Sequence, residues 1–467
     1  MIMHSDGGPR NPTVTFWGAA QSVTGSMHLV EVGGDRILLD CGSVRGERRQ
    51  QRVRGGNFPF EPDTIDAVVL SHAHVDHCGN LPNLVRQGFG GPIYCTDATF
   101  DLISLMLADS ARIQEEEERV LSVIGGEGTG PSTAVSPRRH VEQTLDQCVT
   151  VAYGEAVQVT PHAELRMLDA GHILGSAMVA LKLAGPRRDV TLTFTGDLGR
   201  RGLPFLRDAD PVPAADLLLC ESTYGGRLHQ TVEAMADTFA AVVARSAGEG
   251  GIVLIPAFSL GRTQLVVHYL RRWMNEGRLP HLPIFVDSPL AADIADVYTL
   301  YPELFPEPPL GEDGNGEVQY VRSPRESDEL AERRGPCIVV ASGGMCEGGR
   351  IVKHLRRHID DPRASLVLVS YQAPDSLGRQ LLEKRPRARF HGRVWNKWID
   401  VVEVNGFSGH ADRDDFLAYL GPLAGRTGKV RLVHGEPEQS WALAETLAGA
   451  GFADVDVPAP EETVSVG

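Results

Sequence analysis

Three histidines and one aspartate stand within six positions of one stretch, His72-Ala73-His74-Val75-Asp76-His77. Imidazole nitrogens and a carboxylate together form a ligand set that suits zinc, with manganese or iron as alternatives. His72 and His74 are two positions apart, a spacing that shares a face only in extended chain, because side chains two apart diverge on a helix. Asp76 and His77 are adjacent and must point in different directions. One turn could therefore supply ligands to two metal ions.

The elements that position this stretch are short strands. The largely apolar run 65–70 directly precedes it and is typical of a buried strand, so the ligands would lie on the turn that leaves the strand. Asp40 ends another strand-like run, 36–40. A carboxylate at that point could orient a metal-bound histidine, although it could equally well begin a turn.

The same pattern, an apolar strand followed by a polar side chain and a nearby glycine, recurs five times further along the chain. The five strands and the polar residues that follow them are 165–168 with His172, 190–194 with Asp197, 217–220 with Glu221, 401–404 with His410, and 430–433 with His434. Active sites of α/β sheets lie beyond the carboxyl ends of strands. A single one of these histidines would more often be a hydrogen-bonded core residue. Five such strand ends beside the 72–77 stretch favour one common site.

Length and composition limit the class of protein. The 467 residues allow two or three domains, and a hydrophobic fraction of 42% with 23% charged residues is that of an ordinary globular protein. The sequence has no apolar run long enough to span a membrane, and the first eleven residues lack the apolar centre of a signal peptide. The seven cysteines are odd in number and form no CxxC pair, which favours reduced thiols and a cytoplasmic location.

The net charge of −16 argues against nonspecific binding to duplex DNA. Basic residues nevertheless gather in two clusters, five arginines within 45–54 and one lysine with four arginines within 384–393. Such clusters are usually solvated faces, but they could also line a channel that follows a phosphate backbone.

The organisation of the chain changes near residue 210. The first third is rich in strands, followed by a helix over 99–121 and a Gly/Pro/Ser-rich loop over 125–136. Four strand–turn–helix units follow between 210 and 392, and alternation of this kind predicts a parallel sheet with helices on both faces. We therefore predict a discontinuous first domain, 1–210 plus 393–467, with a second α/β domain inserted over 211–392, where 306–316 would be a surface loop.

Two turns of the predicted insertion could contact phosphate. The loop Ser342-Gly343-Gly344 opens toward a helix and could cradle a phosphate with backbone N–H groups. Arg262 follows another strand and could contact backbone phosphate. Ordinary strand–helix turns explain both features equally well.

Together these motifs resemble those of a known family. The order and rough spacing of the first set resemble the metallo-β-lactamase fold, an αββα sandwich; this set is His72-x-His74-x-Asp76-His77, Asp40, His172 and Asp197. Glu221, His410 and His434 resemble three further motifs of the β-CASP nucleases, and the inserted block resembles the parallel α/β β-CASP domain. Because His434 is present, the chain is more similar to the RNA-processing branch, which includes the pre-mRNA 3′-end cleavage nuclease subunit, than to the DNA cross-link repair branch.

The resemblance implies two zinc ions, with manganese as the alternative. His72, His74 and His172 would bind one ion, Asp76, His77 and His434 the other, and Asp197 would bridge them. Asp40 would act from behind the ligands. His410, supported by Glu221, would lie near the scissile phosphate and donate a proton to the departing ribose oxygen.

The expected activity is hydrolysis of single-stranded RNA in a cleft between the two domains, with endonuclease favoured over 5′-exoribonuclease. A metallo-hydrolase of small esters or thioesters is an alternative, although a small substrate needs no inserted domain. A non-catalytic RNA-binding scaffold is a second alternative, which the complete set of ligand positions disfavours. No separate RNA-binding module is apparent, so a partner or a homodimer could supply substrate affinity.

Overall fold

The computed structural model describes residues 11–44, 58–124, 137–203, 205–306, 318–373, 376–383, 385–390 and 392–467. Its chain forms two compact units. The first comprises Met1–Leu228 together with His410–Gly467, and the second comprises His229–Gly409. The chain therefore leaves the first unit once, builds the second, and returns, as expected for an inserted domain.

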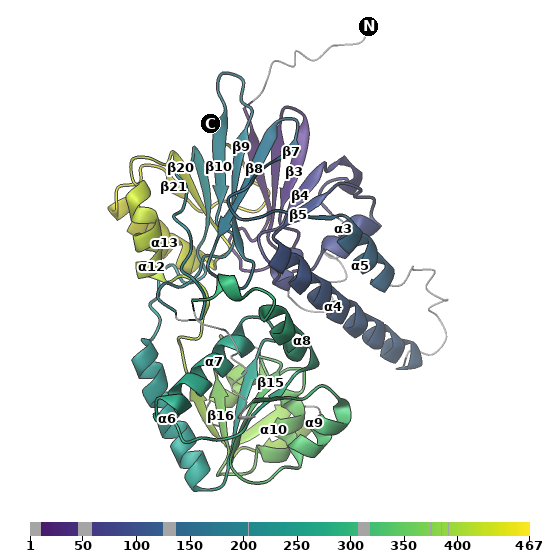
Figure 1. Ribbon diagram of the computed structural model, residues 1–467, viewed down its shortest axis with the longest axis vertical. Helices are drawn as coiled ribbons and strands as arrows, with labels where there is room; N and C mark the ends of the chain where they lie inside the picture. The colour runs from purple at the N-terminus through teal and green to yellow at the C-terminus, as the bar shows by residue number, and fades with distance from the viewer. Residues whose placement is uncertain are drawn as a thin grey trace. The chain divides into compact units, whose positions relative to one another are not determined.

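The first unit contains two seven-stranded sheets (Figure 1). The first sheet has the order β22-β1-β2-β3-β4-β5-β6, with bounds β1 (Thr13–Gly18), β2 (Met27–Val32), β3 (Asp35–Leu39), β4 (Ala67–Val69), β5 (Ile93–Cys95), β6 (Cys148–Thr150) and β22 (Thr463–Ser465). The second has the order β21-β20-β11-β10-β9-β8-β7, with bounds β7 (Ala156–Thr160), β8 (Ala163–Asp169), β9 (Ala177–Leu183), β10 (Val190–Phe194), β11 (Leu217–Glu221), β20 (Lys429–Val433) and β21 (Val455–Asp456).

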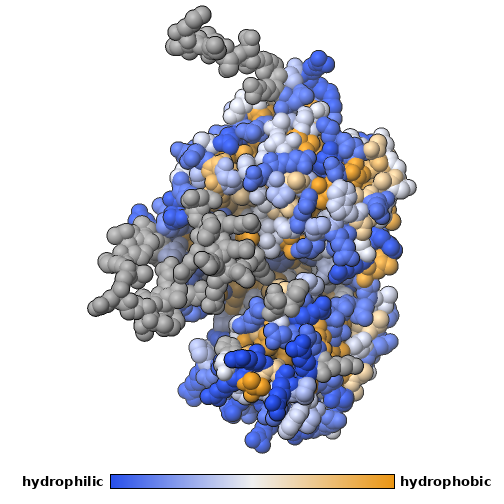
Figure 2. All heavy atoms as spheres, turned by 180° about the vertical axis from the view of Figure 1, so that it is seen from behind, coloured by the Kyte–Doolittle hydropathy of each residue, from blue (hydrophilic) through white to orange (hydrophobic). Residues whose placement is uncertain are grey.

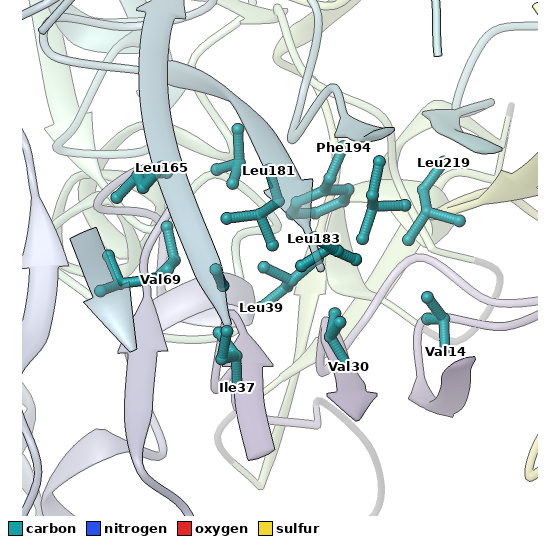
Figure 3. Close-up of a cluster of buried hydrophobic side chains, with 14 of the residues drawn as sticks. Val14, Val30, Ile37, Leu39, Val69, Leu165, Leu181, Leu183, Phe194 and Leu219 are labelled. Carbon is teal, nitrogen blue, oxygen red and sulfur yellow. The ribbon is translucent and has the colours of Figure 1, made fainter. Parts of the chain in front are cut away.

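The inner faces of the two sheets form one hydrophobic core (Figure 3). Val30 and Leu39 of the first sheet belong to the same buried cluster as Leu181 and Phe194 of the second. Successive strand residues point to opposite faces, so alternate apolar positions supply this core. Each fully buried side chain of this kind contributes about 1.5–3 kcal/mol by leaving water. The core fixes the strand ends from which the candidate site is built.

Helices complete the sandwich. Along the chain, the first group is α2 (Val75–Cys78), α3 (Leu81–Arg86), α4 (Asp97–Ile124) and α5 (Pro137–Asp146), and the last two helices are α12 (Arg413–Leu420) and α13 (Pro437–Gly449). Figure 1 shows α3 and α5 beside β4 and β5, and α12 and α13 beside β20 and β21. Phe416 of α12 and Leu443 of α13 share a buried cluster with Leu218 and Leu432, on the second sheet. The unit is therefore the predicted αββα sandwich.

The second unit is built on a six-stranded parallel sheet of order β14-β13-β15-β12-β16-β19. Its strands are β12 (Ile252–Ala257), β13 (Ile284–Asp287), β14 (Val318–Tyr320), β15 (Cys337–Ser342), β16 (Ser365–Leu368) and β19 (Asp400–Glu403). Its helices are α6 (Val232–Gly248), α7 (Arg262–Asn275), α8 (Pro289–Tyr298), α9 (Pro324–Ala331), α10 (Ile351–His358) and α11 (Leu377–Leu382). An antiparallel ribbon of β17 (Arg387–Phe390) and β18 (Arg393–Asn396) is added to it.

The unit limits differ from the predicted 210/211 and 392/393 by 18 and 17 residues (228 − 210 and 409 − 392). Strand β11 pairs with both β10 and β20 and so lies in the first unit. Strand β19, which pairs with β16, belongs to the second unit, although its sequence pattern resembles that of the ligand-bearing strands. Strand pairing between distant segments, which the local pattern does not encode, decides these memberships.

Some predicted features lie outside the described residues: the arginine cluster 45–54, the loop 125–136 and nearly all of the loop 306–316. Within the described ranges, no helix is long and apolar enough to cross a membrane. Hydrophilic residues cover most of the face drawn in Figure 2. The seven cysteines all carry free thiols, and six of them are buried.

Candidate metal centre

The turn after β4 presents the ligand-rich stretch as its spacing predicted. His74 is the N-cap of α2 and has an extended backbone, so the chain up to it is strand-like and the helix begins one residue later. His72 Nε2 lies 3.0 Å from His74 Nδ1. Asp76 and His77 stand in the first turn of α2, where the helical rotation directs them to a second position.

Asp197 lies at the centre of the site, just beyond the end of β10, with 2% of its surface exposed. Its Oδ2 is 3.4 Å from His72 Nε2 and 3.5 Å from His172 Nε2. Its Oδ1 is 3.3 Å from His77 Nε2 and 3.5 Å from His434 Nε2. Each carboxylate oxygen therefore faces a different pair of imidazoles, which is the arrangement of a group that bridges two cations.

Three groups of potential ligand atoms lie around this carboxylate among the described residues, and within each group the atoms lie within 4.8 Å of one another. Two supply the imidazoles that face Asp197; they are His72, His74, His172 and Asp197, and Asp76, His77 and His434. The third is Asp197, Glu221 and His410. Among the described residues, neither His77 Nε2 nor Asp197 Oδ1 has a hydrogen-bond partner, although both are buried. Buried polar atoms without partners are costly, and a bound cation would satisfy them. The side chains therefore fit metal ions.

Asp40 lies behind His77 and fixes the orientation of its ring. Asp40 Oδ2 is 2.7 Å from His77 Nδ1 and accepts from the Ser26 hydroxyl at 3.0 Å. Burial by itself would raise the pKa of Asp40, but His77 and the hydrogen bonds from His77 and Ser71 hold that pKa below its usual value. The ionised carboxylate thus favours the Nδ1–H tautomer of His77 and leaves Nε2 to face Asp197.

Glu221 and His410 form a separate pair at the same edge. His410 Nδ1 lies 3.0 Å from Glu221 Oε1, and the Leu198 N–H donates to the same oxygen at 2.8 Å. Glu221 is fully buried, whereas the His410 side chain is 18% exposed. His410 Nδ1 is also 3.9 Å from Asp197 Oδ2. A half-buried imidazole held by a buried carboxylate can exchange protons with a substrate that lies beside the groups of potential ligand atoms.

Mutual electrostatics and burial shift the pKa values within the site. Burial would raise the pKa of Asp197, but surrounding imidazoles, foremost His434 and His77, hold it well below its usual value. Burial lowers the pKa of His74 to about 3, and burial with the neighbouring His410 lowers that of His172 well below its usual value. Asp197 is therefore ionised and these two histidines are neutral, the states that metal ligation requires.

Two serines complete the site without having been singled out in the sequence. The Ser71 hydroxyl lies 3.0 Å from both Asp40 Oδ2 and His72 Nδ1, and the Ser176 hydroxyl accepts from the His172 N–H. In the sequence, the position of Ser71 directly before His72 was a signal that its hydroxyl could contact the site. Ser176 lies four residues after His172, and only the turn geometry shows its role.

The predicted phosphate contacts lie in the second unit, at the carboxyl ends of its strands. Ser342 ends β15, and its hydroxyl accepts from the Arg350 N–H. Gly343 has a φ of 109°, which side chains rarely adopt. Arg262 begins α7, and its Nη1 donates to the Val369 carbonyl oxygen at 2.5 Å. Gly344 packs against the Phe258 ring.

Comparisons with known proteins agree with this fold and site. Three family models match in order: the metallo-beta-lactamase superfamily over 22–161, the Beta-Casp domain over 263–381, and the Zn-dependent metallo-hydrolase RNA specificity domain over 399–458. This combination defines the class of β-CASP metallo-hydrolases.

Relatives that match nearly all of this chain show which family within that class it belongs to. A Thermus thermophilus protein named as a ribonuclease is 36% identical over 93% of this chain and 96% of its own length. The transcription termination factor FttA of Methanothermobacter thermautotrophicus is 30% identical over 97% of this chain and 71% of its own. A crystal structure of an Enterococcus faecalis protein of unknown function shares the fold, with a TM-score of 0.53 and 13% identity over 97% of this chain and 99% of its own. This chain belongs to the β-CASP family of metal-dependent ribonucleases.

Proposed function

We propose that this chain hydrolyses phosphodiester bonds of single-stranded RNA with two zinc ions, and that it cuts within the strand. The observation that carries the proposal is the position of Asp197, whose two oxygens face separate groups of imidazoles. His72, His74 and His172 would hold one ion, and Asp76, His77 and His434 the other. A single-ion hydrolase would not need the second group.

Bound divalent cations would supply the positive charge that generates a nucleophile from water and stabilises the phosphoryl oxygens during displacement. Asp197 would hold both ions, and its negative charge would offset part of theirs. Asp40 would keep the His77 ring in the required tautomer through the 2.7 Å contact with Nδ1. In these roles the side chains are already positioned to bind the ions before the metal arrives.

The departing ribose oxygen needs a proton, and His410 is the proposed donor. Glu221 accepts from His410 Nδ1, and Nε2 is the proposed donor atom toward the substrate. The buried carboxylate also stabilises the imidazolium form from which a proton is given. His410 is thus proposed as a catalytic residue, and Glu221 as the residue that positions it.

The loop Ser342–Gly344 and Arg262 are proposed to contact substrate phosphate. The loop follows a parallel strand and has the glycine-dependent backbone that lets N–H groups approach an anion. Arg262 begins α7 shortly after another strand end of the same sheet, and its Nη1 donates to the Val369 carbonyl oxygen.

The test is cleavage of an internally labelled RNA oligonucleotide, with 5′-phosphate and 5′-hydroxyl ends, after the metal content of the protein has been measured. Products cut at internal positions, from the substrate with either 5′ end, support an endonuclease. Single nucleotides released only from the 5′ end would show an exoribonuclease. Asp197→Asn should abolish cleavage, and the exposed Asp189→Asn should not change it. Turnover of a chromogenic ester without RNA cleavage would refute the proposal.

A further inference from the structure

The β17–β18 ribbon of the second unit presents one buried and one exposed face. Ala388 and Phe390, 6% and 7% exposed, belong to the hydrophobic core, and Trp395 packs against the same cluster. Phe390 and Trp395 are stacked, with ring centroids 5.4 Å apart. This apolar face anchors the ribbon to the sheet, so the alternate positions must point into solvent.

The exposed face carries two arginines, and an exposed tryptophan follows the ribbon. Arg387 is paired with Asn396, and Arg389 with Val394, which is 62% exposed. The Lys397 N–H donates to the Pro386 carbonyl oxygen at 2.9 Å, so the ribbon continues past its last assigned residue. Trp398 lies just past the end of the ribbon and is 59% exposed. Its N–H and that of Ile399 both donate to the Ile359 carbonyl oxygen, so the strand alternation ends here.

The arginines on this face are available for an anion. The side chains of Arg387 and Arg389 make no ion pair or hydrogen bond within the part of the chain that the structure describes, and both residues are exposed. Two positions along a strand separate their Cα atoms by roughly 6.6 Å. That separation is close to the step between neighbouring phosphates of an extended single strand. In a chain of net charge −16, such a cationic face is a local exception.

We propose that the exposed arginines of this ribbon and Trp398 at its end bind single-stranded RNA, with Arg387 and Arg389 on adjacent phosphates and Trp398 stacked on a base. The inference rests on the proposed function for the identity of the strand. Cations alone would favour any polyanion, but a solvent-exposed indole at the end of the same ribbon suits unpaired bases, which offer a free ring face. A duplex presents no such face. The ribbon therefore adds to the affinity of this chain for its substrate.

The first experiment measures kinetics on a long RNA of 30 nucleotides. For Arg387→Thr with Arg389→Thr, we expect KM for this RNA to rise about tenfold with kcat unchanged, because neither arginine belongs to the metal centre. The slope of log affinity against log salt should fall by about 1.4, since each lost phosphate contact on a single strand contributes about 0.7. Arg325→Thr with Arg356→Thr removes the same charge from helices of this unit and should leave these values unchanged.

The second experiment measures binding without cleavage, by fluorescence anisotropy of a labelled 30-nucleotide RNA with the metal chelated. Trp398→Ala should weaken binding about tenfold, and Trp398→Tyr should restore most of it. Trp441→Ala, which changes another exposed indole, is the matched control. Equal binding by the ribbon variants and the wild type would overturn the proposal. So would a wild-type dimer that these variants dissociate while RNA affinity stays unchanged, because the face would then join two copies of the chain.

Binding and cleavage separate this proposal from the function on which it rests. If the wild type binds RNA through the ribbon but does not cut it, the surface stands and the nuclease assignment fails. If the wild type cuts RNA and the ribbon variants keep their KM for the long substrate, the nuclease assignment stands and the surface fails.

Discussion

His410 Nδ1 lies 3.0 Å from Glu221 Oε1, although 189 positions separate the two residues. Because the same oxygen also accepts from a backbone N–H, the carboxylate is fixed and in turn fixes the ring. For His410→Gln we expect kcat on RNA to fall by about 10²–10⁴, the usual contribution of a proton donor, with the metal content unchanged. Steady-state kinetics and elemental analysis of the same sample measure both.

Glu221→Gln should lower kcat less than His410→Gln does, because the amide can still accept from the ring but no longer stabilises its charged form. The exposed His281→Gln is the control for loss of an imidazole. A variant at position 410 that loses metal together with activity would indicate that His410 is a ligand, as its distance from Asp197 also allows.

Metal removal should destabilise the first unit. Bound ions stabilise the folded state by RT ln(1 + [L]/Kd), which is about 4 kcal/mol at a free metal concentration 1,000 times Kd. A chelator should therefore lower the melting temperature of the wild type by several degrees, measured by calorimetry. Asp197→Asn should reduce this difference, because each oxygen of Asp197 faces one ligand group. An equal chelator effect in both proteins would argue against a bridging role.

Asp40→Asn tests whether the Asp40 carboxylate positions the ring of His77, a candidate metal ligand. The φ of Asp40 is 59°, a conformation that asparagine also tolerates, so the backbone should keep its path. The amide cannot reproduce the charge that fixes the His77 tautomer, and loss of such a partner typically weakens metal binding 10–100-fold. Competition with a zinc-binding dye measures the change. Unaltered affinity would mean that Ser71 and the backbone suffice to position His77.

Most residues of this candidate site could be identified in the sequence because they follow strands that are themselves easily recognised. His72 to His77 lie on one turn, and Asp197 and His434 follow strongly apolar runs that became β10 and β20. Glycines close to those ends permit the tight turns that direct the side chains inward, as Gly196 does with a φ of 53°. At these positions the apolar strand pattern and the type of the residue that follows the strand therefore indicate the same site.

The unit limits and the supporting hydrogen bonds could not be predicted in this way. Strand β19 has the same apolar pattern as β20, yet it pairs with β16 in another sheet. Only long-range pairing distinguishes the two. The Ser176 contact depends likewise on a turn whose closure brings its hydroxyl to the backbone of His172.

A buried ion network in the second unit makes a prediction for stability. The Asp287 carboxylate accepts from the Ser327 hydroxyl at 2.7 Å, from Arg350 at 2.5 Å and from His354 at 2.8 Å. Burial opposes ionisation, but these partners hold the pKa of Asp287 below its usual value. Its stabilisation is therefore present above the unfolded pKa, about 3.9, and is lost as pH falls through the folded value.

At pH 7, Asp287→Asn should lower the free energy of unfolding by about 3–5 kcal/mol, because Arg350 is left without its buried counter-ion. The half-exposed Asp293→Asn, which also loses an arginine partner, should cost at most about 1 kcal/mol. Denaturant titration of the two variants measures the contrast. Equal losses would show that burial of the network adds nothing.

The burial of the His28 ring leads to a prediction of how the stability of the first unit changes at low pH. The ring lies between Phe16 and Phe194 at centroid distances of 5.5 and 5.4 Å, and burial lowers its pKa to about 3. Above pH 6.5 it is neutral in both states, whereas below that value the unfolded chain takes up a proton that the folded chain does not. Stability is therefore lost as pH falls from 6.5 toward 3, by about 1.4 kcal/mol per pH unit.

His28→Leu should remove that loss. Between pH 6.5 and 4.5, we expect the unfolding free energy of the chelated variant to fall by about 2–3 kcal/mol less than that of the chelated wild type. Chelation of both proteins keeps metal release from contributing to the difference, and His281→Leu controls for an exposed imidazole. Identical pH profiles for His28→Leu and the wild type would mean that the folded state admits a charged ring between the two phenylalanines, contrary to its complete burial.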